Sequence, residues 1–348
     1  MTTGEKTEVD DSATASGPQR LSELPTPCLL VDQAALVHNL DTMSRALPGA
    51  RCRPHVKAHK STALAAKQLA AGHEGLTCAT VREALGLAAA GLGGDILVAN
   101  EVVDAPRLRA LANADARVTI AVDSAQTAGR AAKAGLKEVV VDVDVGLHRC
   151  GCRPADAGQL ADQARSLGLT VRGVMGYEGH AVGKPDRAER ERLTRAAMEL
   201  LVEAHAAVGG ELVTAGGTGT YDCNTWANEI QAGSYLLMDT AYGKLDLPFQ
   251  QALTVLATVI AVSDGWAVAD CGLKALGMDH GLPTVEGAKV RGVHDEHILI
   301  EAEALPSIGD QIRVIPAHVD PTAAYHEAFW LIDGDDVVER MAIDLRGW

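Results

Sequence analysis

The chain has 348 residues, of which 47% are hydrophobic and 22% are charged, a composition typical of a globular protein with one large α/β domain and a smaller companion. Its formal net charge of −15 at pH 7 argues against nucleic acid and anionic membrane as partners, because both would repel an acidic surface. The longest apolar runs, such as residues 253–262, are much shorter than the roughly 20 residues that cross a bilayer.

The N-terminal segment, residues 1–20, is rich in Thr, Ser, Gly, Asp and Glu, so we expect a disordered tail there. It lacks the basic and then apolar pattern of a secretory signal, and we therefore expect a cytoplasmic protein. The seven cysteines are expected to be reduced thiols, because disulfides form in oxidising compartments. Cys150 and Cys152 alone are too few ligands for a zinc site.

Residues 21–250 alternate between short apolar segments and Ala- and Leu-rich segments with the 3.6-residue spacing of helices. The eight apolar segments are residues 51–57, 75–80, 95–100, 118–123, 138–145, 171–177, 212–217 and 229–235. Eight strands is the number that closes a (β/α)8 TIM-type barrel, so we predict this α/β fold. An open doubly wound sheet is the alternative.

The clearest helix of this region follows Pro185-Asp186 and should stop at Gly209-Gly210. Its predicted apolar face comprises Leu193, Ala196, Ala197, Leu200, Leu201 and Ala204.

From Leu253 onward, strand-like segments follow one another without helices between them. Turn pairs such as Asp264-Gly265 and Asp333-Gly334 separate them. We therefore predict that residues 251–348 form an all-β domain. The early strand Cys28–Asp32, which precedes the barrel strands, is a candidate to join it.

Four basic residues, Arg51, Arg53, His55 and Lys57, alternate along the first barrel segment and would point to one face of a strand. The ordinary interpretation is a solvated edge. The alternative places Lys57 at the barrel mouth among like charges, which would lower the pKa of its amine and prepare it for Schiff-base chemistry.

Two Gly-containing segments follow the seventh and eighth predicted strands, at residues 214–222 and 231–235. Glycines let backbone N–H groups approach an anion, and Thr218 and Thr220 add hydroxyl groups. Because barrels commonly bind phosphate with the loops after these two strands, we predict a phosphate site there.

Two further candidates are less specific on residue types alone. Arg149 follows the fifth predicted strand, where it could meet an anion or form a surface ion pair. His318 and Asp320 are two residues apart, so on a strand both would face one direction and could bind one metal ion. This pair also arises often by chance.

Taken together, the order and spacing of these segments resemble the fold-type III pyridoxal-phosphate enzymes, specifically the D-threonine aldolase and D-serine dehydratase family. The resemblance extends from about Leu24 to the C-terminus. The motifs that carry it are PTPCLLVD (25–32), RPHVKAHK (53–60), DVGLHRCG (144–151), GGTGTYD (216–222), QAGSY (231–235), DCGLKAL (270–276) and PAHVDPT (316–322).

The resemblance implies pyridoxal 5′-phosphate as the cofactor, bound to Lys57 as a Schiff base. Arg149 would lie near its phenolic oxygen, Tyr177 would pack against it, and Gln231 would occupy the position that faces the pyridine nitrogen. The implied phosphate loops contain Gly216, Gly217, Thr218, Gly219, Thr220, Gly233, Ser234 and Tyr235.

The resemblance also implies a divalent metal ion on His318 and Asp320, and His180 as a candidate general base. The dehydratases of the family typically pair histidine with cysteine, whereas Asp320 offers a hard oxygen, which favours Mn²⁺ or Mg²⁺ over Zn²⁺. Two segments depart from the family pattern: HEAFWLIDGDD (326–336) and His280 in GMDHG.

The expected reaction is therefore cleavage of a small β-hydroxy-D-amino acid such as D-threonine to glycine and an aldehyde, by a homodimer. The alternatives are a metal-dependent dehydratase of D-serine or 3-hydroxy-D-aspartate, and a 3-hydroxy-D-aspartate aldolase. A non-catalytic pyridoxal-phosphate carrier uses a similar barrel but lacks a β domain, so roughly the last hundred residues argue against it.

Overall fold

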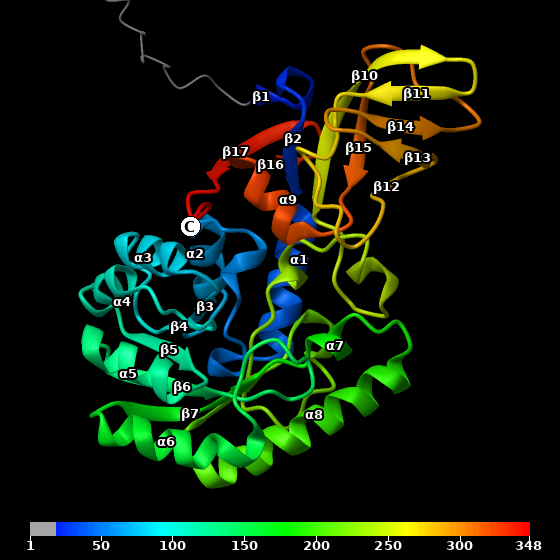
Figure 1. Ribbon diagram of the computed structural model, residues 1–348. Coiled ribbons are helices and arrows are strands. Elements are labelled where there is room, and N and C mark those ends of the chain that lie inside the picture. Colours follow the sequence, from blue (N-terminus) through cyan, green and yellow to red (C-terminus); the bar gives the residue numbers. More distant parts are fainter. Residues whose placement is uncertain (1–18) are drawn as a thin grey trace, which may run out of the picture.

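The computed structural model describes residues 19–348 and shows a barrel of parallel strands beside a second, mixed sheet (Figure 1). Residues 1–18 of the expected tail lie outside the described part. The last two residues of the expected tail, Gln19 and Arg20, are described, and they form a short strand, β1 (Gln19–Arg20). This strand pairs with β17 (Asp336–Ala342).

The barrel contains seven parallel strands in sequence order. These are β3 (Leu76–Cys78), β4 (Ile96–Val98), β5 (Val118–Val122), β6 (Glu138–Asp142), β7 (Thr170–Gly176), β8 (Leu212–Ala215) and β9 (Glu229–Ile230). The segment predicted as the first strand closes the ring through two parallel bridges, Cys52 to Ile230 and His55 to Thr77. The predicted barrel is therefore confirmed, with its first strand reduced to a few residues between two 3₁₀ turns, η2 (Gly49–Arg51) and η3 (Val56–Ala58).

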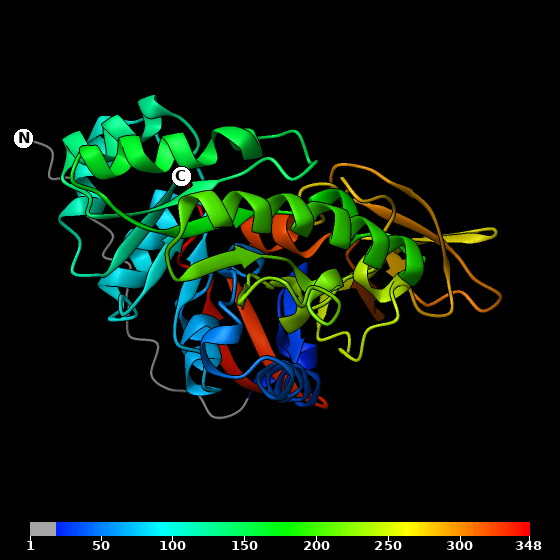
Figure 2. The ribbon, with the colours of Figure 1, turned by 90° about the horizontal axis from the view of Figure 1, so that it is seen from below.

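Helices surround the barrel strands, and the long helix α8 crosses the outside of the barrel (Figures 1 and 2). The helices are α1 (Gln33–Ala46), α2 (Thr62–Ala70), α3 (Val81–Ala89), α4 (Ala105–Ala112), α5 (Ala125–Ala134), α6 (Ala157–Ser166), α7 (Gly179–Val182) and α8 (Arg187–Val208). Asp186 caps α8 by accepting a hydrogen bond from the Glu189 N–H, and Gly209, with φ of 69°, ends it.

The second sheet has ten strands, and its order includes a strand from the beginning of the chain. Its strands besides β1 and β17 are β2 (Cys28–Asp32), β10 (Leu253–Ser263), β11 (Trp266–Ala269), β12 (Thr284–Val285), β13 (Lys289–Val293), β14 (Ile298–Glu301), β15 (Gln311–Ile315) and β16 (Ala328–Asp333). Strand β2 pairs antiparallel with β10 and parallel with β16, so it fixes the second sheet to the start of the barrel.

The β domain carries one helix, α9 (Val319–Tyr325), which the strand-like sequence pattern did not predict. His318 is its N-cap residue and Asp320 lies in its first turn. The two candidate metal ligands are therefore not on a strand, and the expected strand geometry of this pair is wrong.

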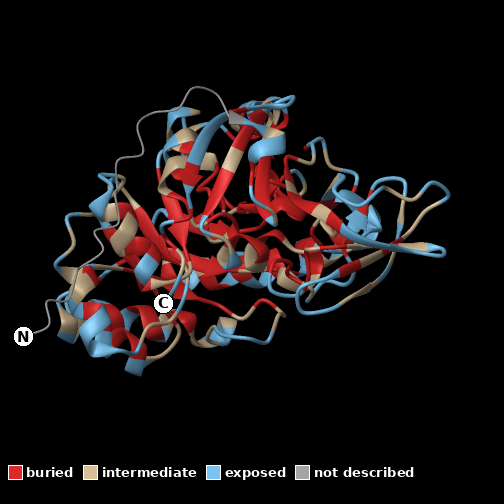
Figure 3. Cartoon of the chain, turned by 90° about the horizontal axis from the view of Figure 1, so that it is seen from above, coloured by how far each residue is buried: buried red, intermediate tan, exposed pale blue. Residues whose placement is uncertain are grey.

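One apolar core runs continuously from the barrel into the β domain. The buried segments fill the centre of both parts, whereas the far end of β10 projects into solvent (Figure 3). In residues 19–348, no helix combines the length and the apolar character needed to span a membrane. All seven cysteines are free thiols.

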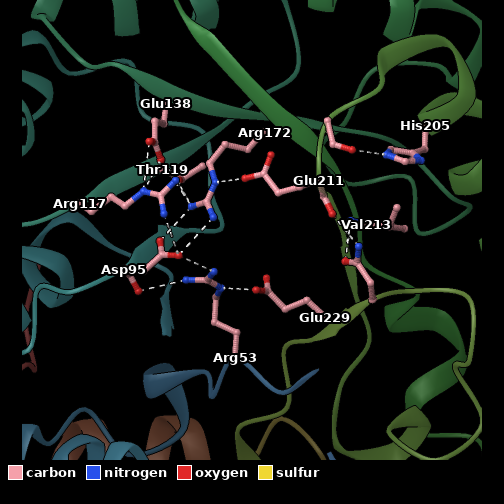
Figure 4. A network of polar contacts seen from close by, with 12 residues as sticks. Arg53, Asp95, Arg117, Thr119, Glu138, Arg172, His205, Glu211, Val213 and Glu229 are labelled. Carbon is pink, nitrogen blue, oxygen red and sulfur yellow. Dashed lines mark hydrogen bonds and ion pairs between the residues drawn. The ribbon is translucent and has the colours of Figure 1, made fainter. Parts of the chain in front are cut away.

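A network of ion pairs occupies the N-terminal ends of the barrel strands (Figure 4). Arg53 lies 3.0 Å from Asp95 and 2.8 Å from Glu229. Arg172 lies 2.9 Å from the same Asp95 and 3.5 Å from Glu138. Both arginine side chains are almost completely buried, 5% and 6% exposed. This end of a barrel contributes stability, since active sites lie at the opposite end.

The network corrects the expected row of basic residues around Lys57. Arg53 belongs to the N-terminal end of the barrel, and Arg51 donates a hydrogen bond to the Ala227 carbonyl. Only His55 and Lys57 of the four reach the barrel mouth. Lys57 is therefore not surrounded by the side chains of the other three basic residues, and this part of the prediction is wrong.

Candidate functional site

A cavity of about 830 Å³ opens at the C-terminal ends of the barrel strands, against the β domain. This is the size range of small-molecule and cofactor sites. The candidate residues that line it are Lys57, Arg149, Tyr177, Gly216, Gly217, Thr218, Gln231, Gly233, Ser234 and His318. The structure therefore brings together residues that are more than 250 positions apart in the sequence.

Lys57 lies on the short turn η3, where its side chain is 42% exposed and faces the cavity. Its Nζ forms an ion pair with Asp320 Oδ1. Burial alone would lower the pKa of Lys57, but the Asp320 carboxylate and then Tyr177 raise it above its ordinary value. The expected lowering of this pKa by like charges is therefore wrong, because the charged group that contacts Lys57 is a carboxylate.

Two loops form the end of the cavity that was predicted to bind phosphate. The Tyr235 N–H donates to Thr218 Oγ1 at 2.9 Å, and this hydrogen bond ties the two loops together. A Cβ on Gly233 would lie 2.5 Å from the His55 carbonyl oxygen, so only glycine lets this loop pack on the lysine segment. A Cβ on Gly217 would project towards Tyr177, at 3.6 Å. This backbone-lined space fits a phosphate group.

A buried carboxylate forms hydrogen bonds with the loop that contains Gly216 and Thr220. Glu178 is fully buried and accepts hydrogen bonds from the Gly216 N–H at 3.0 Å and from Thr220 Oγ1 and Asn224 Nδ2 at 2.9 Å each. Three donors satisfy a charge that would otherwise be costly to bury. Glu178 belongs to the GYEGH segment, but its role was not predicted, because its partners come from residues about 40 positions later.

We expect Glu178→Ala to lower the free energy of unfolding by about 3 kcal/mol or more, since it leaves several buried donors without an acceptor. The same change should weaken binding of pyridoxal phosphate, because the loop loses its support. Chemical unfolding and cofactor titration measure the two effects. Glu199→Ala on the exposed face of α8 is the control and should change neither, and equal behaviour of the two variants would contradict the role of Glu178.

Arg149 and Tyr177 form one wall of the cavity. The Arg149 guanidinium lies 5.8 Å from the centre of the Tyr177 ring. The loop that carries Arg149 is shaped by Asp144, whose Oδ1 accepts hydrogen bonds from the Gly146 and His148 N–H groups. This turn positions Arg149 beside Tyr177, which directly follows β7, so a cation and an aromatic ring lie next to each other in the cavity wall.

Gln231 lines the cavity at the end of the last barrel strand. Its Nε2 donates to Thr214 Oγ1 at 2.9 Å, which fixes the orientation of the amide. A neutral side chain thus occupies this part of the wall.

His318 lines the β-domain side of the cavity, and Asp320 lies beside it, in the wall of a neighbouring cavity that Lys57 also lines. His318 Nε2 lies 3.4 Å from Asp320 Oδ2, and their side chains are 17% and 14% exposed. Asp320 Oδ2 is buried and makes no hydrogen bond among the described residues. Burial raises the pKa of Asp320, but Lys57 outweighs it and keeps this pKa well below the ordinary carboxyl value. An imidazole nitrogen and an ionised oxygen without a hydrogen-bond donor fit a divalent metal ion.

Five candidate residues do not line this cavity. One of them is Asp320, described above. Thr220 points towards Glu178, and a Cβ on Gly219 would lie 1.8 Å from the Val182 carbonyl oxygen. The Tyr235 side chain is fully buried and its hydroxyl accepts a hydrogen bond from Gln68. The His180 ring lies against Gly146, and its Nδ1 is buried without a hydrogen-bond partner among the described residues.

Three further acidic residues at the site were not predicted. Asp239 is fully buried, accepts a hydrogen bond from the Val319 N–H at 2.9 Å, and so links the barrel to the metal-ligand segment. Asp142 and Glu101 both line the cavity. Burial, and then Glu101, raise the pKa of Asp142 well above its ordinary value. No sequence signal marks these residues, because single carboxylates at strand ends are common.

Comparisons with known proteins agree with this arrangement. The family "Alanine racemase, N-terminal domain" matches residues 31–241, and the family "Putative serine dehydratase domain" matches residues 252–332. The first match covers the barrel, and the second covers most of the β domain.

Similar proteins span nearly the full length of the chain. A D-threonine aldolase from Arthrobacter sp. is 32% identical over 94% of both chains. A 3-hydroxy-D-aspartate aldolase from Paracoccus denitrificans is 33% identical over 94% of this chain and 93% of that one. The crystal structure of D-threonine aldolase from Filomicrobium marinum has a TM-score of 0.91 and 33% identity, covering 96% of this chain and 99% of that one. The chain therefore belongs to the fold-type III family of pyridoxal-phosphate enzymes that contains the D-threonine aldolases and D-serine dehydratases, and within that family it is a lyase.

Proposed function

We propose that the protein cleaves the Cα–Cβ bond of a small β-hydroxy-D-amino acid, of the D-threonine type, to glycine and an aldehyde. The observation that carries this proposal is the contact between Lys57 and Asp320. It places the amine that would bind the cofactor beside one of the two groups that would bind a metal ion. When bound, pyridoxal phosphate stabilises negative charge on Cα and a divalent metal lowers the pKa of a coordinated hydroxyl.

The barrel residues would hold and orient the cofactor. Lys57 is its attachment point, and the backbone of the two glycine loops receives its phosphate. Tyr177 supplies an apolar face, and Arg149 supplies positive charge on the same wall. Gln231, fixed by Thr214, presents a neutral amide instead of a cation.

The β-domain residues would hold the metal ion and thereby the substrate. His318 and Asp320 leave most of the coordination shell for water and the substrate hydroxyl, and an oxygen ligand favours Mn²⁺ or Mg²⁺. The hydroxyl proton then needs an acceptor. The expected role of His180 requires a bridging water, because its ring packs against Gly146 instead of lining the cavity.

A second candidate is a 3-hydroxy-D-aspartate aldolase, which needs a cation for the distal carboxylate of its substrate. Lys244 lines the cavity and is exposed, so it is a candidate for this role. A dehydratase is the third candidate, since the β domain matches a serine dehydratase family. In that reaction the Cα proton is lost and the hydroxyl leaves.

Turnover of D-threonine by purified protein separates these reactions. After chelation we expect no products, and after addition of Mn²⁺ we expect glycine and acetaldehyde in equal amounts. L-threonine is the control and should remain intact. Ammonia and 2-oxobutyrate would identify a dehydratase and overturn the proposal. Glycine and glyoxylate from 3-hydroxy-D-aspartate, without reaction of D-threonine, would select the second candidate.

A further inference from the structure

Asp279 lies beside the candidate metal ligand His318, in a loop that the proposed mechanism does not use. Its Oδ2 lies 2.8 Å from His318 Nδ1. His280, the next residue, stacks on the His318 ring with centroids 3.8 Å apart and planes 13° apart. Ligand atoms of Asp279, His280 and His318 lie within 4.8 Å of one another.

Backbone contacts hold the loop that contains Asp279 against the segment that carries His318 and Asp320. Gly277 forms an antiparallel bridge with His318, and its N–H donates to Thr322 Oγ1 at 2.9 Å. Thr322 Oγ1 in turn donates to the His318 carbonyl oxygen at 2.7 Å. A Cβ on Gly277 would lie 2.3 Å from Pro321 Cγ, so glycine is required for this close approach. The position of Asp279 relative to His318 is therefore set by the fold and not by the Asp279 side chain alone.

The two carboxylates near His318 lie at opposite nitrogens of its ring. Asp279 faces Nδ1 and Asp320 faces Nε2. A single ion bound by His318 can use only one of these nitrogens. The Asp320 side is the more buried, with 14% exposure against 57% for Asp279, and it adjoins Lys57. The ion therefore belongs at Nε2, and this leaves Nδ1–H to donate to Asp279.

We propose that Asp279 is a positioning residue that holds His318 with Nε2 directed towards the metal ion. A carboxylate on the far nitrogen fixes the tautomer and the ring orientation and makes the bound nitrogen more basic. The inference rests on the proposed function, because it assumes a metal ion on His318 and Asp320. His280 adds a flat surface that limits rotation of the ring.

The test is the affinity of chelated protein for Mn²⁺, measured from the signal of free Mn²⁺ in electron paramagnetic resonance, without substrate. We expect Asp279→Asn to weaken binding by about 10- to 100-fold, the usual cost of losing such a partner. Asp279→Glu should recover part of the loss. The control is Asp295→Asn, an exposed aspartate of the same domain, which should leave the affinity unchanged. Because the Asp279 side chain is more than half exposed, all three variants should melt at the wild-type temperature.

X-ray absorption of the Mn²⁺ complex gives a second readout. The number and type of coordinating atoms should be the same in wild type and Asp279→Asn. Loss of one oxygen ligand in the variant would show that Asp279 binds the ion directly, which would overturn the inference. Wild-type affinity in Asp279→Asn would also overturn it. If the wild-type protein binds no Mn²⁺, the proposed metal site itself is wrong.

Discussion

Replacement of Lys57 by alanine should leave a folded protein that neither attaches pyridoxal phosphate covalently nor turns over substrate. The Lys57 side chain reaches the cavity at the barrel mouth, beside the glycine loops. We expect turnover to fall by about 10³-fold or more, since a covalent group is lost and not merely weakened. Loss of the visible absorbance of lysine-bound cofactor measures the attachment separately.

Two variants make this prediction specific. Lys67→Ala removes a partly exposed lysine of the next helix, paired with Glu339, and should keep both absorbance and activity. Asp320→Asn should keep the absorbance but lose metal-dependent turnover, because it removes a proposed metal ligand and not the proposed attachment point. Retention of the absorbance in Lys57→Ala would assign the cofactor to another residue.

The barrel could be predicted from the sequence because its strands and helices alternate with clear spacing. The boundaries of α8 follow the same logic, since Asp186 and Gly209 are strong start and stop signals. The prediction of its buried face is less accurate, because Ala196 and Leu200 are exposed, whereas Arg190 and Thr194 are buried. An alanine-rich helix has little contrast between its faces, so small shifts of the apolar stripe escape a sequence argument.

The first barrel strand and helix α9 show a different limit. Residues 51–57 alternate like a strand, but the chain pairs only at Cys52 and His55, because it turns into η3 to aim Lys57 at the cavity. The spacing of His318 and Asp320 is typical of a strand, whereas Asp239 from the barrel accepts a hydrogen bond from the Val319 N–H at the start of α9. In both segments, tertiary contacts determine the secondary structure.

Motifs identified many of the residues that line the cavity, but not Asp142 and Glu101, and not the residues that support the cavity wall. Lys57, the glycine loops and His318 occur in short, distinctive segments. Glu178 and Asp279 act through partners 38 and 39 positions away, and single acidic residues give no signal of such contacts. The fold is needed to show which group each carboxylate contacts.

Arg53→Met should be among the most destabilising single changes in the barrel, although Arg53 lies at the end of the barrel away from the cavity. The variant leaves Asp95 without one of the two arginines that hydrogen-bond to its carboxylate and removes the cation next to Glu229, whose side chain is only 4% exposed. Breaking a buried ion pair by removing one partner costs about 3–5 kcal/mol, because the remaining charge is buried without compensation. Urea unfolding measures this loss.

The Asp95 carboxyl makes the loss of stability in Arg53→Met depend on pH. Burial raises its pKa, but hydrogen bonds from Arg53 and Arg172 outweigh burial and leave the pKa below its ordinary value. A carboxyl with a lowered pKa stabilises the fold above the ordinary pKa of about 4, and this contribution disappears as the pH falls through the lowered value. The difference between wild type and Arg53→Met should therefore be largest near neutral pH and shrink in acid.

Two further variants separate charge from packing in this network. Gly75→Ala keeps every charge, but its Cβ would lie 2.4 Å from Arg53 Nη1, so it should displace the guanidinium and destabilise the same end of the barrel. Arg153→Met removes an exposed arginine, 82% accessible and paired with Asp156, and should unfold at the wild-type urea concentration. If Arg53→Met behaved like Arg153→Met, the network would contribute nothing to stability. We instead expect Arg53→Met and Gly75→Ala to unfold at lower urea concentrations than Arg153→Met. That result would show that the ion-pair network at the N-terminal end of the barrel, opposite the cavity, contributes to stability.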